Sequence, residues 1–231
     1  MSLLLLVLRP EPGASATAHR ARALGLAAFV EPLFEIAPLP WIAPDPADFD
    51  AVMMTSANAA RHGGPQLARY RGLPLFAVGP ATAAAARAAG FNVAVQGGGD
   101  VSALWTGVEA GPHRRVLQLG GEHRRSCTPA RIAVVEVPVY LSRAVDGLSN
   151  AARDVARSGA IALLHSPRAA ALFAGLIDRA EINRTLVHIV AISATAAQRA
   201  GTGWAGVMAA DEPSDAAMLA IARGVCETGA P

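Results

Sequence analysis

The stretch Phe49 to Arg61, FDAVMMTSANAAR, begins as an apolar run and changes at Thr55-Ser56 into an alanine-rich segment. A short apolar run that ends at a polar residue is typical of a buried strand, and alanine is the strongest helix former. The stretch therefore predicts a strand that runs directly into a helix, with Ser56 at the helix N-terminus. The pattern returns at Ala160 to Phe173, AIALLHSPRAAALF, where Ser166 stands in the place of Ser56.

Strand–helix units of this kind recur along the whole chain. We expect strands at Leu3–Leu8, Val52–Thr55, Leu75–Val78, Val93–Val95, Val116–Leu119, Ala133–Tyr140, Ala160–Leu164, Ile189–Ile192 and Val207–Ala209. We expect helices at Ser15–Leu24, Ala57–Arg69, Thr82–Ala89, Val101–Val108, Leu148–Arg157, Arg168–Asp178, Thr195–Ala200 and Asp215–Val225. Regular alternation with short turns, and strands that are apolar throughout, predict doubly wound parallel α/β sheets covered on both faces.

Two segments interrupt the alternation. Leu33 to Asp48 is rich in proline, and Glu136 to Val145 is a long extended stretch. Proline favours extended connectors. We therefore expect residues 39–138 to form a lobe inserted into a discontinuous lobe of residues 1–36 and 143–231, with linkers near 33–40 and 136–143. On this interpretation Leu3–Leu8 belongs to the same sheet as Ala160–Leu164.

An internal repeat supports two similar lobes. Ser56, the segment Gly79 to Ala83 and the Asp100/Leu104 pair in the middle of the chain correspond, in the same order, to features of the C-terminal part. The corresponding features are Ser166, the segment Ser193 to Ala196, and the Asp215/Leu219 pair.

The repeated hydroxyl residues suggest a ligand site. Ligands of open α/β sheets bind beyond the carboxyl ends of the strands, where Ser56, Thr82, Ser166 and Thr195 are expected. For each hydroxyl taken alone, capping of the helix N-terminus is the simpler role. Helix N-termini also bind anions, so several of them together would suit a ligand with several negative groups.

Two other features bear on a site. Gly120-Gly121 follows a predicted strand and precedes Arg124 and Arg125, which fits either close approach of a ligand or a plain turn with solvated charges. Tyr140 lies on the second extended stretch and serves either as packing or as a hydroxyl donor.

Composition excludes several classes of function. All 20 basic residues are arginine, so no lysine can form a Schiff base or complete a phosphate-binding loop. The formal net charge of +2 does not indicate nucleic-acid binding. Leu3–Leu8 is too short for a signal peptide or a membrane span, and two cysteines fit a reducing cytoplasm. His123 and Cys127 have no second ligand pair, so we expect no metal.

Together these fragments resemble the uroporphyrinogen-III synthase family over nearly the whole chain. The resemblance rests on LRPEPGASATAHRARALG (Leu8–Gly25), MTSANAAR (Met54–Arg61), FAVGPATAAAARAAGF (Phe76–Phe91), LQLGGEHRR (Leu117–Arg125), VPVYLSR (Val137–Arg143), HSPRAAALF (His165–Phe173) and DEPSDAAML (Asp211–Leu219). It departs from the family where Ser193-Ala194 replaces the usual Gly-Pro and where His165 precedes the Ser-Pro.

The resemblance implies two flavodoxin-like lobes joined by a two-stranded linker, with the active site in the cleft between them. It implies cyclisation of hydroxymethylbilane to uroporphyrinogen III, with loss of water and inversion of the last pyrrole ring, without metal or organic cofactor. We expect the protein to be a cytoplasmic monomer. The family's linker tyrosine falls on Tyr140, our candidate catalytic residue. The candidate substrate-binding residues are Arg9, Ser56, Gly79, Thr82, Gly120, Gly121, Ser166 and Thr195.

The chemistry implied by the family needs few acid–base groups. Loss of the substrate hydroxyl gives a reactive azafulvene, which cyclises unaided to the uninverted isomer, so the enzyme acts chiefly by orientation. Tyr140 is expected to donate a proton to the departing hydroxyl or to orient it. The alternative is a two-lobed binding or sensor protein for a small anionic ligand, because the repeat by itself fits that equally well.

Overall fold

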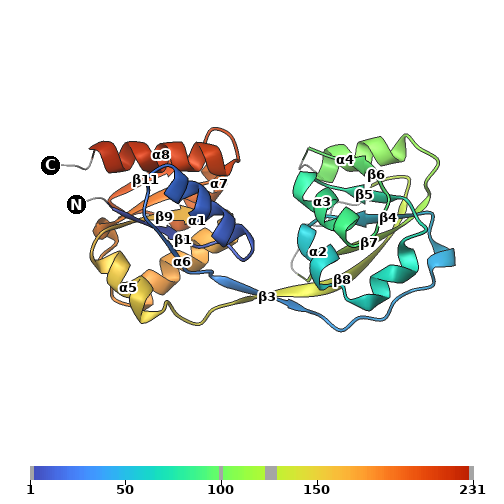
Figure 1. Ribbon diagram of the computed structural model, residues 1–231, viewed down its shortest axis with the longest axis horizontal. Helices are drawn as coiled ribbons and strands as arrows, with labels where there is room; N and C mark the ends of the chain where they lie inside the picture. The colour runs from blue at the N-terminus through green and yellow to red at the C-terminus, as the bar shows by residue number, and fades with distance from the viewer. Residues whose placement is uncertain (1–2, 99–100, 123–128, 229–231) are drawn as a thin grey trace. The chain divides into compact units, whose positions relative to one another are not determined.

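The computed structural model describes residues 3–98, 101–122 and 129–228. The chain divides into two compact units (Figure 1). Unit 1 comprises residues 1–35 and 144–231, and unit 2 comprises residues 36–143. Asp100, His123, Arg124, Arg125 and Cys127, which the sequence analysis singled out, lie outside the described residues.

Unit 1 contains one five-stranded parallel sheet in the order β11-β10-β9-β1-β2. The strands are β1 (Leu4–Val7), β2 (Ala28–Val30), β9 (Ala160–Leu164), β10 (Val187–Ala191) and β11 (Gly206–Ala209). β1 pairs with β9 from Leu4↔Ala160 to Val7↔Leu163, which confirms the predicted sheet membership of the N-terminal strand. In chain order the sheet reads 2-1-3-4-5, the order of flavodoxin-like folds, and it reverses between β1 and β9.

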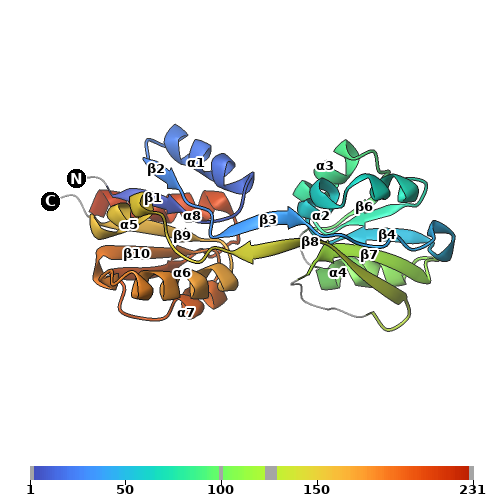
Figure 2. The same ribbon diagram turned by 90° about the horizontal axis from the view of Figure 1, so that it is seen from below.

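Helices cover both faces of this sheet (Figure 2). Helices α1 (Gly13–Ala23) and α8 (Asp215–Thr228) pack on one face, where they share an apolar cluster with Leu5 and Val7. Helices α5 (Asn150–Arg157), α6 (Pro167–Arg179) and α7 (Ala194–Ala200) pack on the other face, around Phe173. A short 3-10 helix, η3 (Arg184–Leu186), precedes β10. All five residues of β9 are buried because both faces are covered, which explains their uniformly apolar sequence.

Unit 2 contains a six-stranded sheet in the order β3-β8-β7-β4-β5-β6. Its strands are β3 (Phe34–Pro38), β4 (Ala51–Met54), β5 (Leu75–Ala77), β6 (Val93–Gln96), β7 (Arg115–Gly121) and β8 (Ala133–Ala144). The pairs from β8 to β6 are parallel, whereas Figure 2 draws β3 and β8 as arrows in opposite directions. The boundary between the units falls within β3 and within β8. The order of the parallel strands reverses between β4 and β7.

The helices of unit 2 also lie on both faces of its sheet. Helices α2 (Ala57–His62) and α3 (Pro80–Ala88) bury residues on one side, and α4 (Val101–Glu109) buries Leu104, Trp105 and Val108 on the other. Each unit is thus a doubly wound α/β body, and the predicted fold class is confirmed.

One local prediction is wrong. The helix expected at Ala57–Arg69 ends at His62, and a separate 3-10 helix, η2 (Pro65–Tyr70), follows. Gly64 between them has a φ of 74° and Pro65 opens η2, so the first helix cannot continue. The proline-rich segment, which its residues alone mark only as a connector, provides one strand of the two-stranded linker that the resemblance implies. It contains the strand β3 and a short 3-10 helix, η1 (Pro46–Asp48).

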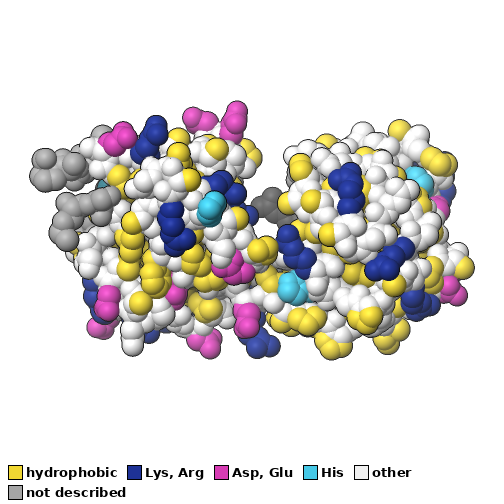
Figure 3. Space-filling model, in the orientation of Figure 1, with side chains coloured by type: hydrophobic (Ala, Val, Ile, Leu, Met, Phe, Trp, Pro, Cys, Tyr) yellow, Lys and Arg dark blue, Asp and Glu magenta, His cyan; other side chains and the backbone are white. Residues whose placement is uncertain are grey.

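The surface carries no large region of one charge on the face drawn in Figure 3, where basic and acidic side chains occur in small separate groups. Among the described residues, no helix has the length and apolar character that crossing a membrane requires.

Candidate active site

In unit 1, Arg9 and His165 lie at the point where the strand order reverses. Val7 of β1 pairs with Leu163 of β9, and Arg9 and His165 each stand two residues beyond that pair. The carboxyl ends of β1 and β9 are therefore the place in this sheet where a ligand is expected.

Ser166 begins helix α6 beside this point. Its hydroxyl oxygen accepts a hydrogen bond from the backbone N–H of Ala169 at 3.1 Å, and Pro167 occupies the first helical position. Ser166 is therefore a helix cap, as the sequence predicted. The cap leaves the hydroxyl proton free to be donated to a ligand.

Thr195 does not cap helix α7. Ser193 does so, because its hydroxyl accepts from the N–H of Ala196 at 3.3 Å, while Thr195 lies inside the helix and is exposed. The capping role considered for Thr195 is therefore wrong. The serine that replaces glycine in the family pattern performs it instead.

In unit 2 the strand order reverses between β4 and β7, and the same spacing recurs. Met54 pairs with Leu119, and Ser56 and Gly121 each stand two residues beyond that pair. The hydroxyl of Ser56 accepts from the N–H of Asn58 at 3.2 Å and caps α2, as expected.

Gly79 and Thr82 lie at the start of helix α3. Gly79 is the residue before the helix, and no side chain caps it. Thr82 is the third helical residue, is 6% exposed, and its hydroxyl bonds to none of the described residues. The capping role considered for Thr82 is wrong as well, and its hydroxyl remains available.

Gly120 and Gly121 end β7, and Gly121 lies against Tyr140 of the neighbouring strand. The register shifts between these two glycines, so that Gly121 faces Tyr140. A Cβ atom on Gly121 would lie 2.8 Å from Cζ and 3.0 Å from the hydroxyl oxygen of Tyr140. The tyrosine ring therefore occupies space that only glycine leaves free. Within the described part of the chain, the Tyr140 hydroxyl makes no hydrogen bond.

His62, the last residue of α2, lies near Tyr140. The two ring centroids are 6.5 Å apart, and the rings are tilted by 45°. Burial, with a smaller contribution from the charge of Arg61, lowers the pKa of His62. Sequence reasoning did not select His62, because no local pattern shows that the end of α2 approaches β8.

Asp215 is the centre of a polar network in unit 1 that sequence reasoning also missed. Its carboxylate accepts hydrogen bonds from Arg9, Thr17, Arg20 and His165. Burial acts to raise the pKa of Asp215, but hydrogen bonds from His165, Thr17 and Arg20 outweigh it and hold the pKa well below the usual range. The sequence placed Asp215 at a helix start but gave no signal of its partners.

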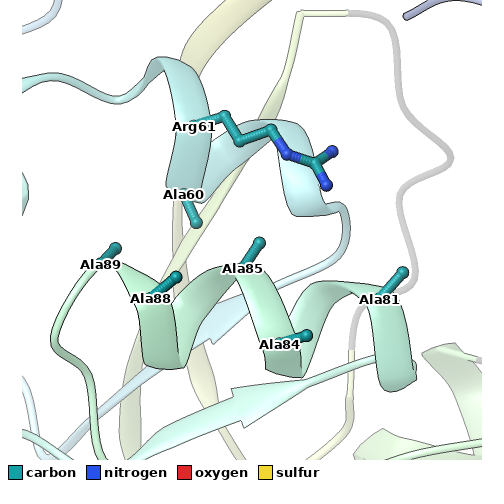
Figure 4. Close-up of a pocket in the computed structure, with 7 residues that line it drawn as sticks. All are labelled: Ala60, Arg61, Ala81, Ala84, Ala85, Ala88 and Ala89. Carbon is teal, nitrogen blue, oxygen red and sulfur yellow. The ribbon is translucent and has the colours of Figure 1, made fainter. Parts of the chain in front are cut away.

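A hollow of about 520 Å³ lies between α2 and α3, lined by Arg61 and by six alanines (Figure 4). Its lining is almost entirely methyl groups, and Arg61 is the one charged side chain there. It is formed by the flanks of the two helices. The described residues contain no group of three or more histidine, cysteine or acidic side chains that could hold a metal ion.

Comparisons with known proteins agree with this architecture. The sequence model described as "Uroporphyrinogen-III synthase HemD" matches residues 15–220. A comparison with curated protein sequences gave no match.

Two solved structures resemble the chain over almost its full length. The uroporphyrinogen-III synthetase from Helicobacter pylori is 19% identical, covers 97% of this chain and 100% of its own, and has a TM-score of 0.69. A mutant uroporphyrinogen III synthase from Thermus thermophilus is 13% identical, covers 99% and 100%, and has a TM-score of 0.53. At these identities the structures show the shared fold, whereas the match of the sequence model shows the family. The chain therefore belongs to the uroporphyrinogen-III synthase family, the cyclising lyases of tetrapyrrole biosynthesis.

Proposed function

We propose that Tyr140 and the strand-end residues described above carry out the family's reaction in this chain. That reaction is the cyclisation of hydroxymethylbilane to uroporphyrinogen III, with loss of water and inversion of the last pyrrole ring. The observation that carries the function is the family match over residues 15–220. No structural observation favours the alternative of a binding or sensor protein.

In this proposal, Tyr140 assists the departure of the substrate hydroxyl. The phenol donates its proton as the carbon–oxygen bond breaks, and the hydroxyl leaves as water. The support is that Tyr140 makes no hydrogen bond through its hydroxyl to the described residues and rests on Gly121. A phenol is a weak acid, so its contribution is modest, and orientation of the azafulvene supplies most of the acceleration.

The carboxylates of the substrate are held, in this proposal, by hydroxyls, helix N-termini and Arg9. Thr82 and Thr195 make no side-chain hydrogen bonds to described residues, so their hydroxyls can donate to a carboxylate. Ser56 and Ser166 use their oxygens as caps but keep their protons. The N-terminal N–H groups of α3 and α6 add positive potential.

The glycines have a different role in this proposal. Gly79, which precedes α3, and Gly120, near the end of β7, let the substrate approach the backbone closely, since neither carries a side chain. Gly121 contributes the space that Tyr140 occupies.

We further propose that the enzyme works as a monomer in the cytoplasm, without metal, organic cofactor or nucleic acid. Cysteine usage supports this compartment, since the chain has two cysteines and Cys226 is free. Light scattering gives the molar mass of the purified protein at working concentration and so tests whether it is a monomer.

The test of function is product analysis. Purified protein is incubated with freshly prepared hydroxymethylbilane in buffer that contains a chelator, and the oxidised products are separated by chromatography. We expect the type III isomer to exceed the type I isomer from the unaided reaction. Isomer I alone, formed at the rate seen without protein, would refute the proposal.

A further inference from the structure

Asp215 collects four side-chain donors from three segments of unit 1. The distances to its carboxylate are 3.0 Å from Nη1 of Arg9, 2.7 Å from Nε2 of His165 and 2.6 Å from Oγ1 of Thr17. Arg20 is the fourth donor. Thr17 is fully buried, and the side chains of His165 and Asp215 are only 7% and 12% exposed. The network is therefore largely buried and differs from an isolated ion pair on the protein surface.

The network carries more positive than negative charge. Two guanidinium groups meet a single carboxylate, so one positive charge remains uncompensated even if His165 is neutral. The side chains of Arg9 and Arg20 are 33% and 49% exposed, so part of each faces solvent. Each guanidinium has five N–H donors, and within the described chain each uses a single nitrogen. The remaining donors are available to an external anion.

The network lies where a ligand is expected. Arg9 and His165 follow β1 and β9, the two strands between which the order of the sheet reverses. Ser166, the cap of α6, comes directly after His165. The Nδ1 atom of His165 is buried and has no hydrogen-bond partner among the described residues. A purely structural ion pair needs neither excess charge nor this position.

A glycine gives Arg9 its place. A Cβ atom on Gly13, the first residue of α1, would lie 2.6 Å from Nε and 3.0 Å from Cζ of Arg9. The guanidinium of Arg9 therefore lies against the start of α1, and its Nη1 donates a hydrogen bond to Asp215. Because the colliding atoms end a flexible side chain, a small side chain at residue 13 would displace Arg9 at little cost in stability.

We propose that Asp215 is a positioning residue that holds Arg9 and Arg20 as a two-arginine subsite for a carboxylate of the linear tetrapyrrole. Asp215 separates two cations that would otherwise repel each other and fixes their direction, while His165 and Thr17 fix Asp215. Guanidinium groups held in this way bind a carboxylate through parallel charge-assisted hydrogen bonds. The inference rests on the proposed function, because it takes the substrate from there.

The experiment compares steady-state kinetics of wild type with Arg9→Gln, Arg20→Gln, Gly13→Ala and Asp215→Asn. Asp178→Asn is the matched control, because Asp178 also pairs with an arginine, Arg184, in the same unit but belongs to the last turn of α6. We expect KM to rise roughly 10-fold for the Arg9 and Asp215 variants, the usual size of one charge-assisted contact. The kcat should stay within about 2-fold, because the proposed contact is to a carboxylate and not to the reacting carbon.

A double variant tests whether Asp215 acts through the arginine. If it does, Arg9→Gln/Asp215→Asn has nearly the same KM as Arg9→Gln alone. A merely structural role would instead give a further loss in the double variant, together with a lower kcat. If Asp215→Asn does not fold, the KM values of Gly13→Ala and Arg20→Gln test the subsite instead, because both variants leave Asp215 in place. A raised KM supports the subsite, and an unchanged KM refutes it.

Failure of this inference is distinguishable from failure of the proposed function. If wild type forms the type III isomer while every variant keeps its KM within about 2-fold, the subsite is refuted and the function stands. If wild type forms only isomer I, the proposed function fails. Binding of uroporphyrin III, measured through the fluorescence of the porphyrin, then tests whether the subsite exists. Weaker binding in Arg9→Gln and Asp215→Asn then supports it, and unchanged binding refutes it.

Discussion

Tyr140 lies with its ring over the backbone of Gly121, in the space where any side chain at residue 121 would project. We predict that Gly121→Ala lowers kcat by about 10-fold or more, because the new methyl group must push the ring and its hydroxyl aside. The same overpacking should cost about 1–3 kcal/mol of stability in unit 2. Kinetics with hydroxymethylbilane and thermal unfolding of the same samples give both quantities.

Gly72→Ala is the control for this change, because a Cβ there meets no atom within 4 Å. It should behave as wild type. In addition, if Gly121 acts through the tyrosine, Gly121→Ala combined with Tyr140→Phe should be no slower than Tyr140→Phe alone. Full activity in Gly121→Ala would show that the position of the ring does not matter.

Tyr140→Phe tests the hydroxyl itself. If the phenol protonates the departing hydroxyl, kcat should fall by roughly 10²-fold, the usual contribution of one general acid. KM should change little, because the carboxylates are bound elsewhere. If the ring only packs, phenylalanine preserves that packing and the loss is small.

The ratio of the two isomers provides a second measurement on Tyr140→Phe. Because orientation supplies most of the catalysis, the slow reaction should still yield mainly the type III isomer. Wild-type turnover in Tyr140→Phe, beside an inactive Ser56→Ala, would remove the acid role and transfer it to the strand ends.

The fold was accessible from sequence because its main signals are local. Runs such as Ala51–Met54 and Ala160–Leu164 are fully buried and are followed two residues later by serine caps, so the apolar pattern and the polar residues after it identify both strand and helix. The pairing of β1 with β9 followed from the two interruptions of the pattern. The residues of β3 by themselves indicate only a connector, because its prolines suit one equally well, and the strand is held by pairing with β8, a partner distant in sequence.

The candidate site could be predicted only in part, because some of its contacts join residues that are distant in sequence. Ser56 and Ser166 could be placed because each lies two residues after the end of a buried strand. The contacts of Asp215 join residues up to 206 positions apart, and no sequence period encodes such distances. The approach of His62 to Tyr140 likewise depends on how α2 packs against β8.

The hydroxyl residues divide into two classes with opposite expected effects. Ser166→Ala removes a cap and should cost about 1 kcal/mol of stability. Thr82→Val keeps the shape of a buried side chain whose hydroxyl bonds to no described residue, so unfolding should change little while KM rises a few-fold. Thermal unfolding with and without uroporphyrin III separates the two effects. Equal destabilisation by both substitutions would contradict this division.

The last prediction concerns acid stability and follows from the lowered pKa of Asp215. In the unfolded chain an aspartate titrates near pH 3.9. Because the folded pKa lies below that value, the unfolded state binds the proton first as pH falls. The stabilisation is therefore complete above about pH 5 and is lost progressively on acidification below about pH 4.

Asp215→Asn should remove this contribution at every pH. We expect it to destabilise unit 1 by on the order of 2–3 kcal/mol at pH 7, since it leaves hydrogen-bonded cations without their carboxylate. Toward pH 3 the difference in unfolding free energy between wild type and variant should become smaller, because wild type loses the stabilisation from the Asp215 carboxylate and the variant has no such carboxylate to lose. Urea unfolding at pH 7, 5, 4 and 3 measures this difference, and Asp178→Asn, whose carboxylate is exposed, should show a much smaller one. If the difference in unfolding free energy between wild type and Asp215→Asn stays constant down to pH 3, the folded and unfolded states bind the same number of protons at Asp215 in this range. The ion-pair network would then not be the source of the stabilisation.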